Sequence, residues 1–344
     1  MKLTTFSLAV VVSLSVQAAV AEPIVEAQPA YQLPLAQHTL LTDLVKVSDQ
    51  LYVAVGDRGH VLTSQTGTDW TQAVTPVQSL LTSVYFADQK HGWAVGHDAS
   101  IIATDDGGHH WSLQQFKPET DKPLFDILFE SPSHGIAVGA YGMFFRTTDA
   151  GKSWLAEFHE ELVGDEDREF LQELKETDPE GYEAEKASIL PHFNRLYMHQ
   201  GTLYLVGEAG FFATSTDFGK SWVRQSEFYN GSLFGLTKSL KGSLIAVGLR
   251  GHAFRSTDEG QNWQAIALPS EATLNSAFSA DDGSLYLTGN AGTLLKSIDD
   301  GLTFSKVATE DSKAILNALV IGQQLVQVTE AGVRFTPLKE DQAL

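Results

Sequence analysis

The eight residues STDEGQNW (256–263) decide the fold, because their pattern occurs six times along the chain. The other copies are TSQTGTDW (63–70), TDDGGHHW (104–111), TTDAGKSW (147–154), STDFGKSW (215–222) and SIDDGLTF (297–304). Successive copies end 41, 43, 68, 41 and 41 residues apart. Self-similarity at a period of about 41 residues indicates a repeat architecture.

Each shared position of the motif has a physical role in a tight turn. An aspartate can accept hydrogen bonds from nearby backbone N–H groups, a glycine can adopt a positive φ angle, and the final aromatic residue can pack against the turn or a neighbouring repeat. A single catalytic site does not need six copies, so we expect these residues to be structural. They are Asp106, Asp149, Asp217, Asp258 and Asp299; Gly67, Gly108, Gly151, Gly219, Gly260 and Gly301; and Trp70, Trp111, Trp154, Trp222, Trp263 and Phe304.

Short apolar strands surround each motif, as in LYVAVG (51–56) and LTSVYF (81–86). Three or four strands in about 41 residues match one blade of an all-β propeller with four-stranded antiparallel blades. Six complete motifs and a partial unit after Phe304 predict seven blades, with six or eight as alternatives. We expect Tyr31–Leu35 to supply the missing fourth strand of the seventh blade and so close the ring.

The composition limits the function classes. Residues 1–21 combine Lys2, a short apolar run and an A-x-A site, which predicts a cleaved signal peptide ahead of a single propeller domain at 22–339. Export to the periplasm is expected, with secretion as the alternative. The chain has no cysteine, so no disulfide can form, and its formal charge of −20 argues against nucleic-acid binding. No later stretch is long enough to span a membrane, and we expect a monomeric ring.

One interval of the repeat is longer than the others and carries an acidic insertion at about 160–190. Between Glu157 and Lys186 there are 13 acidic residues and three basic ones, a local net charge of −10. The pattern predicts short helices over 165–176 and 177–186, with Phe170 and Leu174 on one side of the first. Our hypothesis is that the insertion covers or shapes the channel mouth and contacts a partner; the alternative is a solvated lid.

The motif S/T-x-D-x-G-x-x-W, preceded by an apolar strand and a G-x-x-G turn, resembles the Asp-box (BNR) repeat of the photosystem II stability and assembly factor family. That family also has relatives in non-photosynthetic bacteria. The resemblance covers about Tyr31 to Pro337 and implies a seven-bladed binding protein that helps to assemble membrane complexes through a basic patch. Arg58 and Arg250 occupy turns where such arginines would lie, although this chain is acidic.

Loops over a propeller channel are the usual binding surface. The candidate partner-binding residues are Asp57, Arg58, His97, Asp98, Tyr141, Glu208 and Arg250, together with Phe170 and Leu174 of the insertion. Ordinary turn residues are the simpler interpretation. The predicted function is a non-catalytic assembly or accessory factor for an envelope or membrane protein complex, such as a transporter.

A glycan-binding or glycoside hydrolase propeller of the sialidase type is the alternative function. Sialidases grip a carboxylate with three arginines, but Arg146 and Arg255 occupy equivalent repeat positions here, as structural residues would. Carboxylates are abundant, but sequence does not give the separation that acid–base catalysis requires. His109 and His110 are adjacent inside one motif, and no calcium loop is complete, so we expect neither a metal nor a cofactor.

Overall fold

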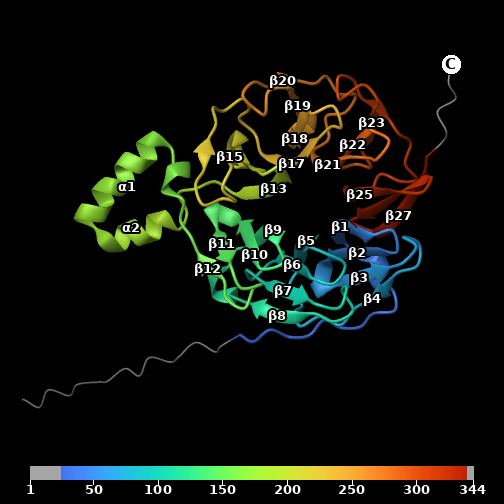
Figure 1. Ribbon diagram of the computed structural model, residues 1–344, viewed down its shortest axis with the longest axis horizontal. Helices are drawn as coiled ribbons and strands as arrows, with labels where there is room; N and C mark the ends of the chain where they lie inside the picture. The colour runs from blue at the N-terminus through green and yellow to red at the C-terminus, as the bar shows by residue number, and fades with distance from the viewer. Residues whose placement is uncertain (1–24, 339–344) are drawn as a thin grey trace, which may run out of the picture.

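The computed structural model describes residues 25–338, which form a ring of seven antiparallel sheets around a central channel (Figure 1). Six of the described sheets have four strands, and the seventh has three. The prediction of a seven-bladed propeller is confirmed. The expected signal peptide at 1–21 lies outside the described residues.

The strands follow the order of the repeat. Blade 1 contains β1 (Leu41–Ser48), β2 (Leu51–Gly56), β3 (Val61–Ser64) and β4 (Thr71–Gln72). Blade 2 contains β5 (Leu81–Phe86), β6 (Gly92–Gly96), β7 (Ile101–Thr104) and β8 (Ser112–Gln115). Blade 3 contains β9 (Leu124–Ser131), β10 (His134–Gly139), β11 (Phe144–Thr147) and β12 (Leu155–Ala156). Blade 4 contains β13 (Phe193–His199), β14 (Thr202–Gly207), β15 (Phe212–Ser215) and β16 (Val223–Arg224).

The last three blades repeat this arrangement. Blade 5 contains β17 (Leu233–Lys238), β18 (Leu244–Gly248), β19 (Ala253–Ser256) and β20 (Gln264–Ala265). Blade 6 contains β21 (Leu274–Ser279), β22 (Leu285–Gly289), β23 (Leu294–Ser297) and β24 (Ser305–Lys306). Blade 7 contains β25 (Ile315–Ile321), β26 (Gln324–Thr329) and β27 (Gly332–Pro337). Short 3-10 turns include η1 (Ala36–His38), η3 (Pro118–Thr120) and η5 (Glu160–Leu162).

The first strand of each blade lies innermost, because these strands contact one another from blade to blade around the channel. The second strands are the most buried: every residue of β6, β18 and β22 is buried. Blades pack face to face, so a second strand is covered on both sides, and apolar side chains are favourable on both faces. This explains continuous apolar runs such as LIAVG in β18.

The ring closes in a way that the sequence did not predict. Tyr31–Leu35 does not form the fourth strand of blade 7, whose described sheet contains only β25, β26 and β27. Blade 1 holds this segment instead: the Leu33 N–H donates to Gln72 Oε1, and Gln72 Nε2 donates to the Tyr31 carbonyl, both at 2.9 Å. Pro34 also lacks the N–H that a paired strand would donate. The segment still packs Leu33 against the apolar cluster between blades 7 and 1.

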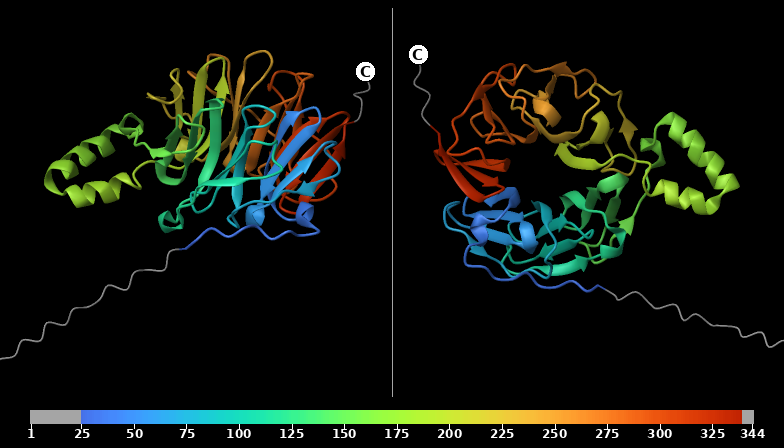
Figure 2. Two further views of the ribbon diagram at one scale, coloured as in Figure 1. Left: turned by 60° about the horizontal axis from the view of Figure 1, so that its bottom comes forward. Right: turned by 180° about the vertical axis from the view of Figure 1, so that it is seen from behind.

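The acidic insertion forms α1 (Asp165–Thr177) and α2 (Pro179–Lys186), which confirms the two predicted helices. Figures 1 and 2 show that this hairpin extends sideways from the ring, away from the channel. The hypothesis that it covers the channel mouth is therefore wrong. Its anchor is Leu171, which is 1% exposed, whereas Phe170 is 47% exposed. Neither described helix is long and apolar enough to cross a membrane.

Candidate functional site

The Asp-box turns have the structural role that the sequence predicted. In the copy at 256–263, Asp258 Oδ1 accepts from the Ser256 hydroxyl at 2.7 Å and from the Asn262 N–H at 2.9 Å. Ser256 Oγ accepts from the Gly260 N–H at 2.9 Å, and Trp263 Nε1 donates to the Gly260 carbonyl at 3.0 Å. The aspartate therefore holds the turn, and the tryptophan closes it.

The first copy differs from the others. The Gly67 N–H donates to Ser64 Oγ, three residues earlier, where the other copies span four residues. Ser64 rather than Thr63 thus occupies the first position, and the turn is one residue shorter. In place of the missing aspartate, Thr66 Oγ1 accepts from the Asp69 N–H at 3.3 Å.

In two copies the closing tryptophan packs against an aromatic ring of the preceding blade. The ring of Trp263 in blade 5 meets Phe212 in blade 4 edge-on, with centroids 5.4 Å apart. Trp222 in blade 4 meets Phe144 in blade 3 in the same way at 6.4 Å. Arg146 adds a polar link, since it donates to the Phe218 and Gly219 carbonyls in the next Asp-box at 2.9 and 2.7 Å. The motif thus joins blades.

Hydrogen bonding also shifts the titration of these carboxylates. The pKa values of Asp149, Asp217, Asp258 and Asp299 fall to about 2, first through a side-chain donor four residues later and then through its N–H. In Asp106 burial opposes the shift, and bonds from His110 and its neighbours still bring the pKa to about 2. The lowered pKa values follow from the hydrogen bonds with which these carboxylates hold their turns.

The predicted partner-binding residues lie on the opposite face, in the turns between second and third strands. Arg58, Asp98, Tyr141 and Arg250 occupy the same position of four turns, with left-handed φ angles of 55°, 59°, 52° and 55°. Ala209 has φ 52° at the same position. Because an alanine shares it, this conformation belongs to the repeat and is not by itself a sign of function.

The structure brings only part of this predicted set together. Asp57 and Arg58 contact each other at 3.4 Å, and Asp98 accepts from the Ser79 hydroxyl at 2.5 Å. His97 and Arg250 are exposed on turns of blades 2 and 5. Tyr141 and Glu208, however, line one cleft beside the insertion. On the hairpin, Phe170 is exposed and Leu174 is half-buried.

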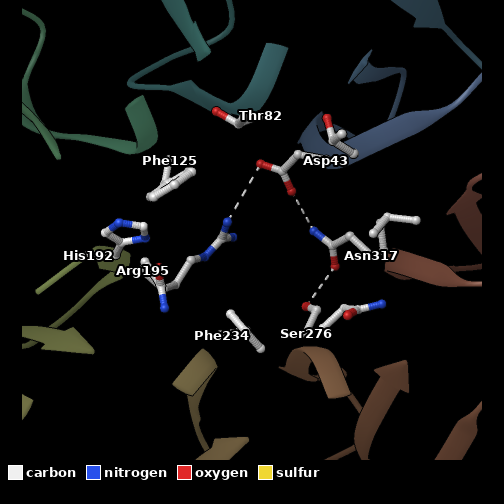
Figure 3. A pocket seen from close by; sticks show the side chains of 12 residues that line it. Asp43, Thr82, Phe125, His192, Arg195, Phe234, Ser276 and Asn317 are labelled. Atoms are coloured by element: carbon white, nitrogen blue, oxygen red, sulfur yellow. Dashed lines mark hydrogen bonds and ion pairs between the residues drawn. The ribbon is translucent and has the colours of Figure 1, made fainter. Parts of the chain in front are cut away.

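The channel mouth is a second site, which the sequence-based interpretation missed (Figure 3). A register shift near the start of each first strand, such as that between Leu41 and Asp43, places a β-bulge there. A bulge changes where successive side chains point, and here two neighbouring residues from several blades line the cavity. The volume is about 360 Å³. The detectable signal was the recurrence of LTD (41–43), LTS (81–83), LFD (124–126) and FNR (193–195) at one place in the repeat.

A belt of polar side chains runs around this channel. Asn317 Nδ2 donates to Asp43 Oδ1 at 2.6 Å, and Ser276 donates to Asn317 Oδ1 at 3.0 Å. The Ser83 hydroxyl lies 3.0 Å from Asp43 Oδ2 and 2.7 Å from Asp126 Oδ1. The belt links blades 6, 7, 1, 2 and 3 through side chains that are mostly buried. It ends on blade 4, whose Leu196 N–H donates to Asp126 Oδ2 at 2.7 Å.

Arg195 is the one cationic side chain among the described residues that line the channel mouth. Its guanidinium lies 3.8 Å from Asp43 Oδ2 and 3.6 Å from Asp126 Oδ2, and its side chain is 34% exposed. Burial raises the pKa of Asp126, and the charge of Arg195 opposes that rise. Asp126 in turn raises the pKa of Arg195. One arginine thus balances two carboxylates whose oxygens already accept hydrogen bonds from neighbouring groups.

Apolar and aromatic side chains complete the channel mouth. Phe125 and Phe234 line it from blades 3 and 5, Leu316 from blade 7, and His192 from the segment leading into blade 4. All four are half-buried, so apolar area remains available to a ligand. Within residues 25–338, no three histidine, cysteine or acidic side chains gather in a way that could hold a metal ion.

A lateral cleft of about 330 Å³ separates the insertion from the rim of blades 3 and 4. Tyr141 and Glu208 belong to ring turns, Asp167 to α1, and Arg224 to the last strand of blade 4. Arg224 NH1 donates to the Leu162 carbonyl at 3.2 Å and NH2 to the Glu227 carboxylate at 3.0 Å, so its charge is engaged. This cleft continues the face that carries the channel mouth.

Comparison with known proteins shows that part of this chain is similar in sequence to photosystem II assembly factors. A family model described as photosynthesis system II assembly factor YCF48 matches residues 62–122. The photosystem II stability/assembly factor HCF136 of Guillardia theta is 43% identical over 51 residues, which are 14% of this chain and 13% of that relative. The sequence similarity therefore covers about one repeat unit and a half.

Solved structures extend the similarity to the whole ring. A structure described as YCF48 bound to D1 peptide aligns with a TM-score of 0.67 over 92% of this chain and 98% of that one, at 18% identity. An ancestral GH74 enzyme aligns with a TM-score of 0.65 over 91% of this chain and 46% of that one, at 13% identity. At these identities both alignments show the propeller fold alone, whereas the sequence similarity is to assembly factors. The comparisons support the resemblance that the sequence predicted: this chain is a β-propeller that contains a segment similar to photosystem II assembly factors.

Proposed function

We propose that this protein is an exported, non-catalytic accessory factor that binds an extended segment of an envelope or membrane protein while its complex assembles. Its relatives with matching sequence are assembly factors, and one solved relative holds a D1 peptide. The predicted signal peptide supports export to the periplasm. A transporter is one class of client that fits this location.

The observation that carries the proposal is the channel mouth. Phe125 and Phe234 offer half-buried aromatic area, and the partly exposed side chain of Arg195 lines the same cavity of about 360 Å³. Aromatic and arginine side chains in a partly desolvated pocket are typical of binding hot spots. The cavity is too small for a folded domain, but it can hold a few side chains of an extended segment.

The same geometry argues for binding rather than chemistry. Asp43 and Asp126 are the channel carboxylates, and both are buried acceptors of hydrogen bonds from neighbouring blades. A general acid or base must reach the substrate proton within hydrogen-bond distance. The oxygens of these carboxylates instead accept hydrogen bonds from other residues of the ring. Their role is to join blades.

A cross-linked pull-down from the native envelope tests the proposal. The bait is the tagged mature protein, compared with F125A/F234A at the channel mouth. The matched control is I298A/L302A, which removes two apolar side chains, 74% and 61% exposed, from the opposite face. We expect one membrane or envelope protein to be captured by the parent and the control and lost from F125A/F234A. Equal capture by all three baits would contradict the proposal.

A further inference from the structure

Contacts at both ends hold the acidic hairpin against the ring. The lateral cleft between the hairpin and the ring is therefore present before any ligand binds. Leu162 and Leu171, 0% and 1% exposed, pack into one cluster with Phe144 and Trp222 of the ring. Lys122 Nζ also donates to the Ala187 carbonyl at the far end of the hairpin, at 2.5 Å. Because both ends of the hairpin are anchored, a ligand would meet a preorganised cleft and would not have to order it.

The walls of the cleft combine polar and apolar side chains. Half-buried Ile189 contributes apolar surface, and Leu190 and Phe211, each 2% exposed, line the cleft at its base. The Tyr141 ring is 45% exposed at the edge, where it packs edge-on against His192 with centroids 4.6 Å apart. These surfaces suit aliphatic or aromatic groups.

The charges around the cleft are almost all negative. Asp167, Glu208 and Glu227 line it, and the only described cation in its lining, Arg224, pairs with Glu227. No ion pair among the described residues involves Asp167 or Glu208. The basic side chains of the insertion are also engaged: Arg168 binds Asp165 at 3.0 Å. Asp167 belongs to the segment of net charge −10 between residues 157 and 186, and Glu208 adds a carboxylate from the ring.

We propose that this lateral cleft binds a Lys- or Arg-bearing segment of a partner protein in which the basic residues alternate with aliphatic ones. Long basic side chains place their methylene stems along apolar walls and their charged heads beside carboxylates, and charge complementarity favours such a segment over an acidic or neutral one. The proposal rests on the proposed function, because the cleft continues the same face and adds a second contact with the client.

Fluorescence anisotropy with purified protein tests this directly. The probe is a fluorescein-labelled peptide of sequence KLRKLRKL, compared with KSRKSRKS, which has the same charge without the apolar residues. The variant D167N/E208Q removes two carboxylates from the cleft. The control E173Q/E180Q removes two exposed carboxylates of the same hairpin that do not line it. Both variants have the same net charge, and unchanged thermal midpoints establish that both are folded.

The expected result is a Kd for KLRKLRKL that rises at least tenfold in D167N/E208Q and less than twofold in E173Q/E180Q. KSRKSRKS should bind at least fivefold more weakly than KLRKLRKL to the parent. Equal weakening by both variants would overturn the proposal, because the affinity would then come from the overall charge of the hairpin. Displacement by spermidine at the peptide's own concentration would overturn it in favour of a polyamine site, and no binding of KLRKLRKL at low salt would overturn it outright.

This assay is independent of the client. If the pull-down finds no partner but the peptide binds as expected, the proposed function is contradicted and the proposal for the lateral cleft is supported. If F125A/F234A no longer captures the client while D167N/E208Q binds KLRKLRKL as tightly as the parent does, the channel-mouth proposal is supported and the cleft proposal is contradicted.

Discussion

Asn317 Nδ2 lies 2.6 Å from Asp43 Oδ1, and this hydrogen bond joins the last blade of the ring to the first across 274 residues. Both side chains are buried, at 8% and 3% exposure. Asp43 also accepts from Ser83 in blade 2. Propeller rings can close by a shared strand, but here a buried polar pair and an apolar cluster connect the two ends.

The first prediction concerns this closure. N317A leaves Asp43 with one hydrogen bond fewer in a buried site, which should lower the free energy of unfolding by about 2 kcal/mol. Urea unfolding measures the change. N230A, at an exposed asparagine, is the control and should change it by less than about 0.5 kcal/mol. If N317A is as stable as the parent, the pair does not hold the ring closed.

The second prediction concerns Arg195 and the pH dependence of stability. Burial already raises the pKa of Asp126, and R195A removes the largest influence that lowers it, which leaves only the hydrogen bonds from Leu196 and Ser83 to oppose burial. A folded-state pKa above the unfolded value gives stability that is present at low pH and lost as pH rises through the folded pKa. R195A should therefore lose stability as pH rises from about 4 to 7, by about 2 kcal/mol rather than the full cost of breaking a buried pair, because Arg195 is partly exposed.

The double variant R195A/D126N provides the control for that measurement. An asparagine cannot ionise, so the thermal midpoint of the double variant should not fall as pH rises over the same range. If R195A and R195A/D126N show parallel pH profiles, Arg195 does not compensate the charge of Asp126.

The third prediction concerns the Asp-boxes in acid. Four of their carboxylates have a folded-state pKa of about 2 against an ordinary value of 3.8. A depressed pKa gives stability that is present above the unfolded value and lost as pH falls through the folded one. The thermal midpoint should therefore fall between about pH 4 and pH 2. A variant with D149N, D217N, D258N and D299N should be less stable at neutral pH and show a shallower fall; a curve parallel to that of the parent would contradict this account.

The fourth prediction concerns the anchor of the insertion. L171A removes a side chain that is 1% exposed and should lower the free energy of unfolding by about 2–4 kcal/mol. F170A, at a residue that is 47% exposed, should change it by less than about 0.5 kcal/mol. Urea unfolding of the two variants compares adjacent positions on one helix. Equal losses would mean that the helix is rotated relative to the orientation described here.

The repeat made the fold predictable from sequence, because each Asp-box is stabilised locally. Ser256, Asp258 and Asn262 bond within six residues of one another, so their chemistry is visible in a short stretch. The blade count followed from counting copies. The two helices of the insertion were also predictable, since acidic residues at a helix start and i, i+4 spacing are local signals.

The sites depend on contacts that no local pattern contains. Arg195 meets Asp43 only because the ring brings blades 4 and 1 to one channel, and the bulges that aim these side chains arise in pairing with the second strands. The prediction of a strand at Tyr31–Leu35 was wrong for the same reason. The backbone of this segment forms hydrogen bonds with the Gln72 side chain, which comes from another part of the chain. By itself the sequence determined the repeat, the turn chemistry and the seven blades, which short-range hydrogen bonds and apolar periodicity encode. Tertiary structure alone decided the ring closure, the channel belt and the cleft, since these join residues that only the closed ring brings together.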